Sequence, residues 1–346
     1  MYTSSLDRAR SSIEALKRHL QTSDSLRKVI HETALACKVE TRCFEPLSAA
    51  AAPDHVEWRI IDHCAAVTRV YAIYEQFAHE MIREHLSLLQ RHYSFDDLDD
   101  SIKNSYRVGL SKILEKKDGP RYGDLDLSLL ITQYNNALTG QPYVLEPRAM
   151  AMQDQNLRLS ELHRLMAACG VDGVDGWIEK HHSVKNFFTS GEDRLAATAR
   201  KELAELIQYR NDAAHGGLVV DDVLGPDVLL EFCDFTAVLC EALAEKVQLV
   251  GLEVMYQKNT AVIHGEVSEL LKDGMVIIGP MQGHFQVGGR IYLCGANYCF
   301  ERTIASIRID DADYQHVSLE EEVEVGVCLD QQGRRGAKVM SIAPLL

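Results

Sequence analysis

The chain has 346 residues, of which 46% are hydrophobic, and a formal net charge of −15 at neutral pH. This length and apolar content allow a buried core and favour two domains, which excludes a disordered or fibrous chain. The acidic balance excludes a broadly basic nucleic-acid-binding surface, because affinity for phosphates depends on clustered Lys and Arg side chains. Any nucleic-acid site must therefore be local.

The amino-terminal segment lacks the layout of a signal peptide, in which charged residues precede an apolar stretch. No stretch approaches the roughly 18 uninterrupted apolar residues of a membrane span. We therefore expect a cytoplasmic protein without a membrane partner. The nine cysteines form no CxxC pair, and the best metal-like spacing, Cys294 with Cys299, has no second pair. We predict reduced thiols, no metal site and no cofactor.

The first part of the chain has helical periodicity. Apolar spacing over 5–20 and 24–39 predicts an amino-terminal helical pair, and an uninterrupted apolar stripe over 56–93 predicts one long buried helix or two nearly continuous ones. Gly and Pro break the pattern over 94–156, which we interpret as an insertion of short helices and loops. Helical spacing then returns over four segments: 158–169, 176–188, 192–209 and 227–249.

Beyond residue 250 the pattern changes to the alternation of β-strands. Short segments divided by Gly and Asp turns fit a small closed barrel of about six strands. These segments are 261–267, 275–279, 290–294, 302–309, 323–329 and 338–342. We predict a multi-domain chain, α then β, with an N-terminal helical extension over 1–52. An all-α domain over 53–250 follows, with its insertion at about 94–156, and the β-barrel occupies 251–346.

The segment from Arg210 to His215 follows the helix predicted over 192–209 and precedes two glycines, which favour a helix C-terminal cap. If the helix persists, Asn211 and His215 lie one turn apart on one face. Arg210 and His215 would then diverge by about 140° and border a cleft. This spacing allows the pair to hold a phosphate from two sides.

These residue types suit phosphate chemistry. His moves a proton near neutrality, Arg presents a fixed positive fork to phosphate oxygens, and Asn orients either group. RNA supplies its own nucleophile, the 2′-hydroxyl, so transesterification would need no metal. The alternative is that Arg210 and His215 only cap the last carbonyls of a helix, where the dipole favours cations.

The sequence YRNDAAHGG, with helices before and after it, resembles the Arg-x4–6-His signature of HEPN domains. The resemblance includes Asn211, the polar residue after Arg210. It also includes RVYAIYEQFAHEMI at 69–82, which is similar to the helix that places an acidic residue near the cleft in HEPN ribonucleases of bacterial defence and toxin systems. Glu75 stands at that place here. The resemblance spans about residues 55–250 and implies a HEPN-like helical bundle.

The resemblance implies a metal-independent endoribonuclease with Arg210, Asn211, His215 and Glu75 as its catalytic residues. It further implies a homodimer through the helical domain, in which two motifs face each other across one RNA groove and cutting leaves a 2′,3′-cyclic phosphate. Candidate RNA substrates are tRNA and ribosomal RNA, and a cognate antitoxin or regulator is a candidate partner. Two alternatives stay open: a non-cleaving RNA or nucleotide binder, and a dimerisation module that presents the barrel to a protein partner.

The carboxyl-terminal part resembles the second-domain β-barrel of elongation-factor-type translational GTPases, through VGGRIYL, RTIASIRI and VGVCLD before a Gly-Arg-Arg-Gly turn. Gly289 and Ala337 depart from positions where that family carries Asp. No G-x4-G-K-[ST] loop occurs, so the chain carries no GTPase. The resemblance implies that the barrel guides a substrate or senses a signal, with RNA contacts from Arg302, Arg308, Arg334 and Arg335. The alternative is that these arginines are ordinary solvated surface.

One histidine pair invites a metal interpretation, since His181 and His182 lie close to Glu179. Neighbouring residues on a helix point about 100° apart, and no third ligand lies at a fitting spacing. We therefore predict two histidines on a helix surface.

Overall fold

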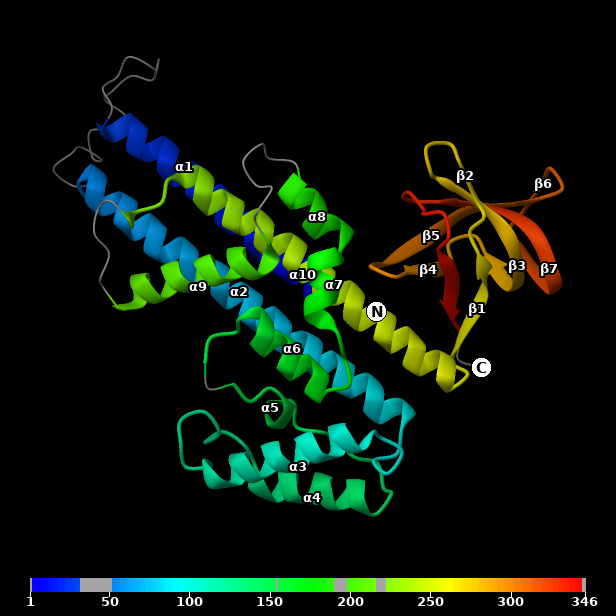
Figure 1. Ribbon diagram of the computed structural model, residues 1–346, viewed down its shortest axis with the longest axis horizontal. Coiled ribbons are helices and arrows are strands. Elements are labelled where there is room, and N and C mark those ends of the chain that lie inside the picture. Colours follow the sequence, from blue (N-terminus) through cyan, green and yellow to red (C-terminus); the bar gives the residue numbers. More distant parts are fainter. Residues whose placement is uncertain (1, 32–51, 154, 190–197, 216–221, 344–346) are drawn as a thin grey trace.

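The computed structural model describes residues 2–31, 52–153, 155–189, 198–215 and 222–343. A helical body is followed by a β-barrel, which stands at the end of the last helix (Figure 1). The predicted fold class, all-α and then a small β-barrel, is confirmed. Within the described residues, no helix is both long and apolar enough to cross a membrane.

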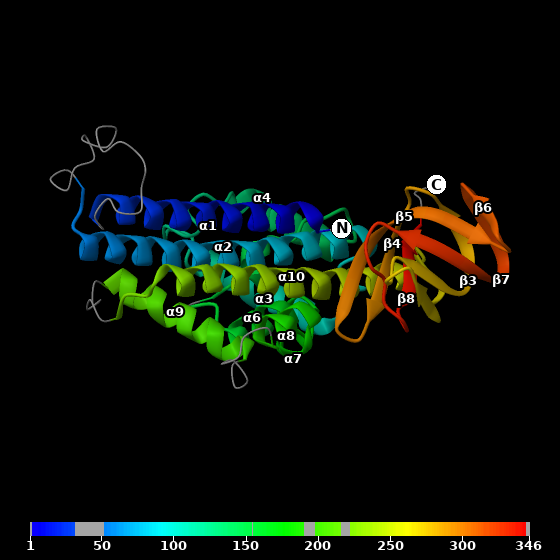
Figure 2. The same ribbon diagram turned by 90° about the horizontal axis from the view of Figure 1, so that it is seen from above.

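Three long helices form the centre of the helical body. They are α1 (Thr3–His31), α2 (His55–His92) and α10 (Pro226–Gln257), and they lie side by side in both views (Figures 1 and 2). The stripe predicted over 56–93 is therefore one helix. Asp54 begins it by accepting hydrogen bonds from two main-chain N–H groups of its first turn. Its apolar side is buried against both neighbours, including the aromatic residues Tyr71, Tyr74 and Phe77.

The prediction of two amino-terminal helices is wrong for the described residues, because α1 continues through 21–23 without a break. The polar residues there form a contact with the neighbouring helix and do not form a turn. Ser23 is buried and donates a hydrogen bond to the carboxylate of Asp62 on α2, at 2.7 Å from Oδ2. The rest of the second predicted helix, 32–39, lies outside the described residues.

The segment predicted as an insertion forms a lobe below α2 in Figure 1. It contains α3 (Asp100–Glu115), α4 (Leu127–Leu138) and the short α5 (Pro147–Met150), which packs against α3 and α2. Its core includes Tyr106, Ile113 and Tyr122, which join the single apolar core of the helical body. The lobe therefore shares the apolar core of the helical body and is not a separate domain.

The following helices differ from the prediction in their bounds. α6 (Leu159–Ala168) is as expected, but the helix predicted over 176–188 is two helices, α7 (Val174–Lys180) and α8 (His182–Thr189). The helix predicted over 192–209 is α9 (Ala199–His215), and the predicted residues 192–197 lie outside the described part of the chain. The helix continues past 209 because no helix breaker occurs before the glycines at 216 and 217. The last helix, predicted to end at 249, continues to Gln257.

Six strands close the barrel, in the order β1-β8-β4-β5-β7-β3 with β3 pairing back to β1, and every pairing is antiparallel. They are β1 (Ala261–Glu266), β3 (Val276–Gln286), β4 (Arg290–Gly295), β5 (Tyr298–Ile309), β7 (His316–Leu329) and β8 (Lys338–Ile342). Two further short strands pair with them in antiparallel fashion: β2 (Glu269–Leu271) with β3, and β6 (Ala312–Tyr314) with β5. The predicted six-strand barrel is confirmed, with longer β3, β5 and β7 than the alternation indicated.

The barrel has its own apolar core, separate from that of the helices. Alternate strand residues point inward and are fully buried, among them Ile277, Leu293, Ile307 and Val325. The end of α10 joins the two parts: Leu252 packs with barrel residues that include Tyr292 and Met340. The helical body and the barrel therefore meet through one continuous helix.

Candidate functional site

The residues 210–215 form the last turns of α9, which Figure 1 shows crossing α2. Leu203, Leu206 and Ile207 are buried and pack this helix against α2. Because α9 remains helical to its last residue, Asn211 and His215 lie one turn apart, as the spacing required. The end of α9 is only partly covered, since Arg210 and Asn211 are half-buried and His215 is exposed.

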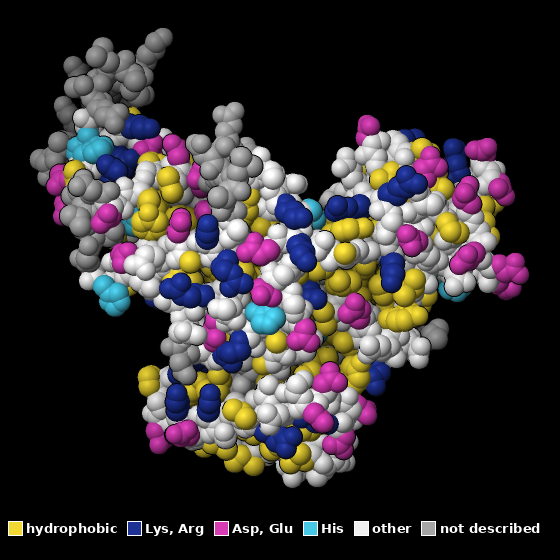
Figure 3. All heavy atoms as spheres, viewed as in Figure 1, with side chains coloured by type: hydrophobic (Ala, Val, Ile, Leu, Met, Phe, Trp, Pro, Cys, Tyr) yellow, Lys and Arg dark blue, Asp and Glu magenta, His cyan; other side chains and the backbone are white. Residues whose placement is uncertain are grey.

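A cleft of about 1020 Å³ lies beside this end of α9. Its lining comes from α2, from α9 and from the two segments of the lobe that approach them. All four residues predicted to be catalytic line it, although they come from distant parts of the sequence: Glu75, Arg210, Asn211 and His215. Lys and Arg side chains border both sides of the recess where α9 faces the lobe (Figure 3).

Arg210 is held by neutral groups. Its guanidinium lies over the ring of Tyr71, 5.0 Å from the ring centre, and its Nη1 lies 3.2 Å from Oδ1 of Asn211 and 3.4 Å from Oδ1 of Asn156. Asn156 also donates a hydrogen bond of 3.0 Å from Nδ2 to Oδ1 of Asn211. These contacts fix the guanidinium at the cleft without neutralising its charge.

Glu75 is positioned from two sides. Its Oε1 accepts a hydrogen bond of 3.0 Å from the hydroxyl of Tyr71 and another from Nε2 of Gln153, a residue of the lobe. The Tyr71 hydroxyl in turn accepts a hydrogen bond from the Leu157 N–H at 2.8 Å. Burial raises the pKa of Tyr71 to about 12, so its hydroxyl stays protonated and able to donate to Glu75.

Two histidines line the cleft. His215 is exposed at the end of α9, where its ring is accessible to a ligand. His79 was not singled out from the sequence, although it stands one turn after Glu75 on the same face of α2 and this spacing could have indicated it. Burial lowers the pKa of His79, which keeps its imidazole neutral near pH 7.

The four barrel arginines with predicted RNA contacts do not line this cleft. Arg302 lies 4.5 Å over the ring of Phe300 and donates to the carbonyl of Gln332 at 3.0 Å, and Arg334 lies 4.5 Å over the ring of Tyr298. At the other end of β5, Arg308 pairs with Asp313. Arg335 is exposed in the turn before β8. The structure thus brings Arg302 and Arg334 to one stacked aromatic pair, Tyr298 with Phe300, and separates Arg308 from them.

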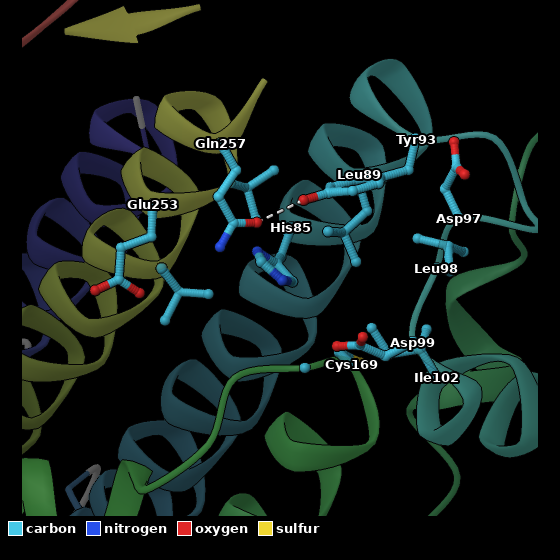
Figure 4. A pocket seen from close by; sticks show the side chains of 13 residues that line it. His85, Leu89, Tyr93, Asp97, Leu98, Asp99, Ile102, Cys169, Glu253 and Gln257 are labelled. Atoms are coloured by element: carbon cyan, nitrogen blue, oxygen red, sulfur yellow. Dashed lines mark hydrogen bonds between the residues drawn. The ribbon is translucent and has the colours of Figure 1, made fainter. Parts of the chain in front are cut away.

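A smaller cavity of about 280 Å³ lies between α2, the start of α3 and the end of α10 (Figure 4). A hydrogen bond of 2.9 Å from Tyr93 to Gln257 spans it. Complete burial lowers the pKa of His85 to about 4, so this ring is neutral, and the acidic lining residues are Asp97, Asp99 and Glu253. This cavity would repel a phosphate, whereas the cleft of Arg210 would attract one.

In a comparison with known proteins, a family model matches the part of the chain that contains the cleft. The family model described as RiboL-PSP-HEPN matches residues 44–248, which is more than half of the chain. The match includes α2, α9 and every cleft residue named above. A search of curated proteins found no match.

Proposed function

The chain belongs to the RiboL-PSP-HEPN family, and we propose that it is a metal-independent endoribonuclease that cuts RNA by attack of the 2′-hydroxyl. One observation carries this proposal. A single cleft gathers Arg210, Asn211, His215 and Glu75, a set able to bind a phosphate and transfer a proton. Family membership supports an RNA-related role for such a cleft.

Arg210 is assigned to hold the scissile phosphate. A guanidinium presents a planar fork that matches two phosphate oxygens, and the described partners of Arg210 are neutral. Asn211 orients this fork through its amide oxygen. Charge that develops on the phosphate during reaction would be stabilised by a cation already fixed in place.

His215 is assigned to proton transfer. The 2′-oxygen bonds to phosphorus and loses its proton to an imidazole, the bond from phosphorus to the 5′-oxygen breaks, and that oxygen receives a proton. The products are a 2′,3′-cyclic phosphate and a 5′-hydroxyl. One His215 serves one of these transfers, so we propose a homodimer through the helical body that supplies the second. Glu75 is assigned to orient the catalytic groups.

We further propose that the barrel guides the substrate or senses a signal. Arg302 and Arg334 flank the stacked rings of Tyr298 and Phe300, and this combination of cations and aromatic faces suits RNA. A role as a defence or toxin effector, restrained by a cognate antitoxin, would fit such an enzyme.

The test is incubation of the full chain with tRNA and total RNA in excess EDTA. We compare the wild type with His215→Ala and with the matched control His163→Ala, which removes a helical histidine outside the cleft that lies 3.1 Å from Asp175. Wild type and control should cut RNA, and His215→Ala should lose about 10²–10⁴-fold in rate. A strict requirement for Mg²⁺ or Mn²⁺, or equal cutting by His215→Ala, would contradict the proposal. RNA binding without any cutting would favour the non-catalytic alternative.

A further inference from the structure

A second group of ionisable side chains lies at the junction of the helical body and the barrel. The prediction of two helix-surface histidines is wrong, because the helix breaks between them: His181 ends α7 with an extended backbone, φ −61° and ψ 139°. The rings of His181 and His182 therefore lie together, with centroids 4.4 Å apart. Glu179 points elsewhere and accepts hydrogen bonds from the first N–H groups of α9.

The third member of the group is Glu245, a residue of α10 that faces the two histidines. Nε2 of His181 lies 3.1 Å from its Oε2, and Nε2 of His182 lies 3.8 Å from its Oε1. One ligand atom from each of the three residues lies within 4.8 Å of the others. Ligands on a tetrahedral Zn²⁺ are about 3.3 Å apart, given Zn–N and Zn–O distances of about 2.0–2.2 Å. The group is therefore close to ligand spacing, and a small movement of the partly exposed His182 would complete it.

Burial of these polar groups lowers stability unless each of them has a partner. His181 is fully buried, and its Nδ1 has no hydrogen-bond partner among the described residues, whereas Nε2 of His181 and Nε2 of His182 face the carboxylate of Glu245 without good hydrogen-bond geometry. Buried polar atoms in proteins are nearly always well paired, so two poorly aligned Nε2 atoms beside one carboxylate favour a ligand that the three groups share. A metal cation is such a ligand, because it accepts lone pairs from two imidazoles and a carboxylate together.

The surrounding contacts orient the candidate ligands. Nδ1 of His182 lies 3.1 Å from the hydroxyl of Ser183, which leaves its Nε2 for the carboxylate side. The Cys299 N–H of β5 donates to Oε2 of Glu245 at 2.7 Å. Such outer contacts are typical of metal sites, because they fix the rings and the carboxylate before the ion binds.

One side of the group is open. A cavity of about 480 Å³ between α1, α10 and the barrel is lined by His182 and Glu245, and Arg302 also borders it. We propose that His181, His182 and Glu245 bind a Zn²⁺ ion, with a fourth coordination position open to this cavity. Three protein ligands and one exchangeable position are the pattern of zinc sites that accept water or a small ligand. The site shares no residue with the RNA cleft and links α7, α8, α10 and, through Cys299, the barrel.

The experiment measures metal binding by the full chain, purified without a histidine tag and stripped with a chelator. Zinc bound per chain is compared for wild type, His182→Gln, Glu245→Gln and the matched control His163→Gln, which alters a half-exposed histidine that also faces a carboxylate. Wild type and control should bind one more Zn²⁺ than the two site variants. The affinity for that ion should fall more than about 100-fold in the variants, because replacing outer contacts alone costs about 10–100-fold.

Co²⁺ added to the wild-type chain gives a second result that does not depend on folding of the variants. The three-ligand site predicts the intense visible absorption of four- or five-coordinate cobalt, displaced by Zn²⁺. The proposal is overturned if wild type takes up no zinc, if all four chains bind it equally, or if cobalt shows only the weak spectrum of the hydrated ion.

Discussion

At the scale of single residues, Tyr71 connects most of the cleft. Its ring lies under Arg210, and its hydroxyl donates to Glu75 and accepts from the buried N–H of Leu157. The same side chain therefore ties α2 to α9 and to the segment that leads into α6. A change at Tyr71 should affect stability as well as chemistry.

We predict that Tyr71→Phe lowers the free energy of unfolding by about 1–3 kcal/mol, because the Leu157 N–H would lose its partner in the interior. Urea denaturation followed by circular dichroism measures this. Tyr256→Phe is the control, since Tyr256 is 49% exposed and its change should stay within about 0.5 kcal/mol. Equal stability of the two variants would contradict the structural role of the Tyr71 hydroxyl.

Arg210→Lys is expected to lower kcat/KM for RNA cleavage by about 10–100-fold, equivalent to the 1.5–3 kcal/mol of a hydrogen bond to a charged group. Lysine keeps the charge but lacks the planar fork and its stacking on Tyr71. Arg200→Lys is the matched control, because Arg200 lies on the same helix and pairs with Asp175, away from the cleft. A full rate for Arg210→Lys would show that charge alone is needed.

At the scale of secondary-structure elements, periodicity predicted which segments are helices and strands, but not where contacts alter them. The polar stretch 21–23 has the local character of a break, yet Ser23 bonds to Asp62 and the helix continues. The pattern over 176–188 is continuous, yet the backbone turns at His181. Both differences arise from tertiary packing, which cannot be predicted from the spacing of apolar residues along one segment.

The same limit applies to the cleft. Arg210, Asn211 and His215 could be found from sequence because they share one helix end, and Glu75 from its place on α2. Asn156 and Gln153 could not, because they lie in the irregular end of the lobe and reach the cleft only after that lobe packs on α2. His181, His182 and Glu245 were missed as a group because α10 supplies the third member.

The packing of α3 on α5 within the lobe can be tested by glycine substitutions. Gly109 of α3 faces the backbone of α5, and a methyl group there would overlap the carbonyl oxygen of Ala149. Gly109→Ala should therefore destabilise the chain by about 1–3 kcal/mol or more. Gly176→Ala in α7 has no atom within 4 Å of the added methyl and should stabilise by about 0.5–1 kcal/mol. Urea denaturation of both variants checks the opposite signs, and a shared sign would contradict the packing of α3 on α5.

At the scale of the whole molecule, α10 belongs to both parts. Its central region lies in the helical core, and Leu252 and Met255 near its end pack against the barrel. A division of the chain at 250 would cut this helix, so we propose the boundary after Lys258. Each side of that boundary has its own buried core.

We predict that a chain ending at Lys258 keeps the helical fold and the RNA-cutting chemistry, because every proposed catalytic residue precedes the cut. Its substrate choice should change, and exposed Leu252 should lower its solubility. Circular dichroism and mapping of RNA fragments measure these effects. A helical but inactive product would leave two explanations. Either the barrel supplies essential RNA contacts, and Arg302 and Arg334 are then the first residues to replace, or its loss misaligns the dimer, which sedimentation would reveal.

The proposed homodimer predicts twice the chain mass in light scattering for both the full chain and this truncated form. The second motif supplies the second proton transfer, so activity should fall as dilution separates the subunits. A monomer that cuts RNA at the full rate would contradict this part of the account.

The central claim is that RNA provides the nucleophile and the cleft of Arg210 and His215 directs it. The most direct measurement uses an RNA cut at one mapped position, beside the same RNA with a single 2′-deoxy nucleotide immediately before that position, both in excess EDTA. The account predicts a 2′,3′-cyclic phosphate on the fragment from the unmodified RNA and no cutting at the deoxy position. Cutting of the deoxy substrate at the same rate and position would contradict it.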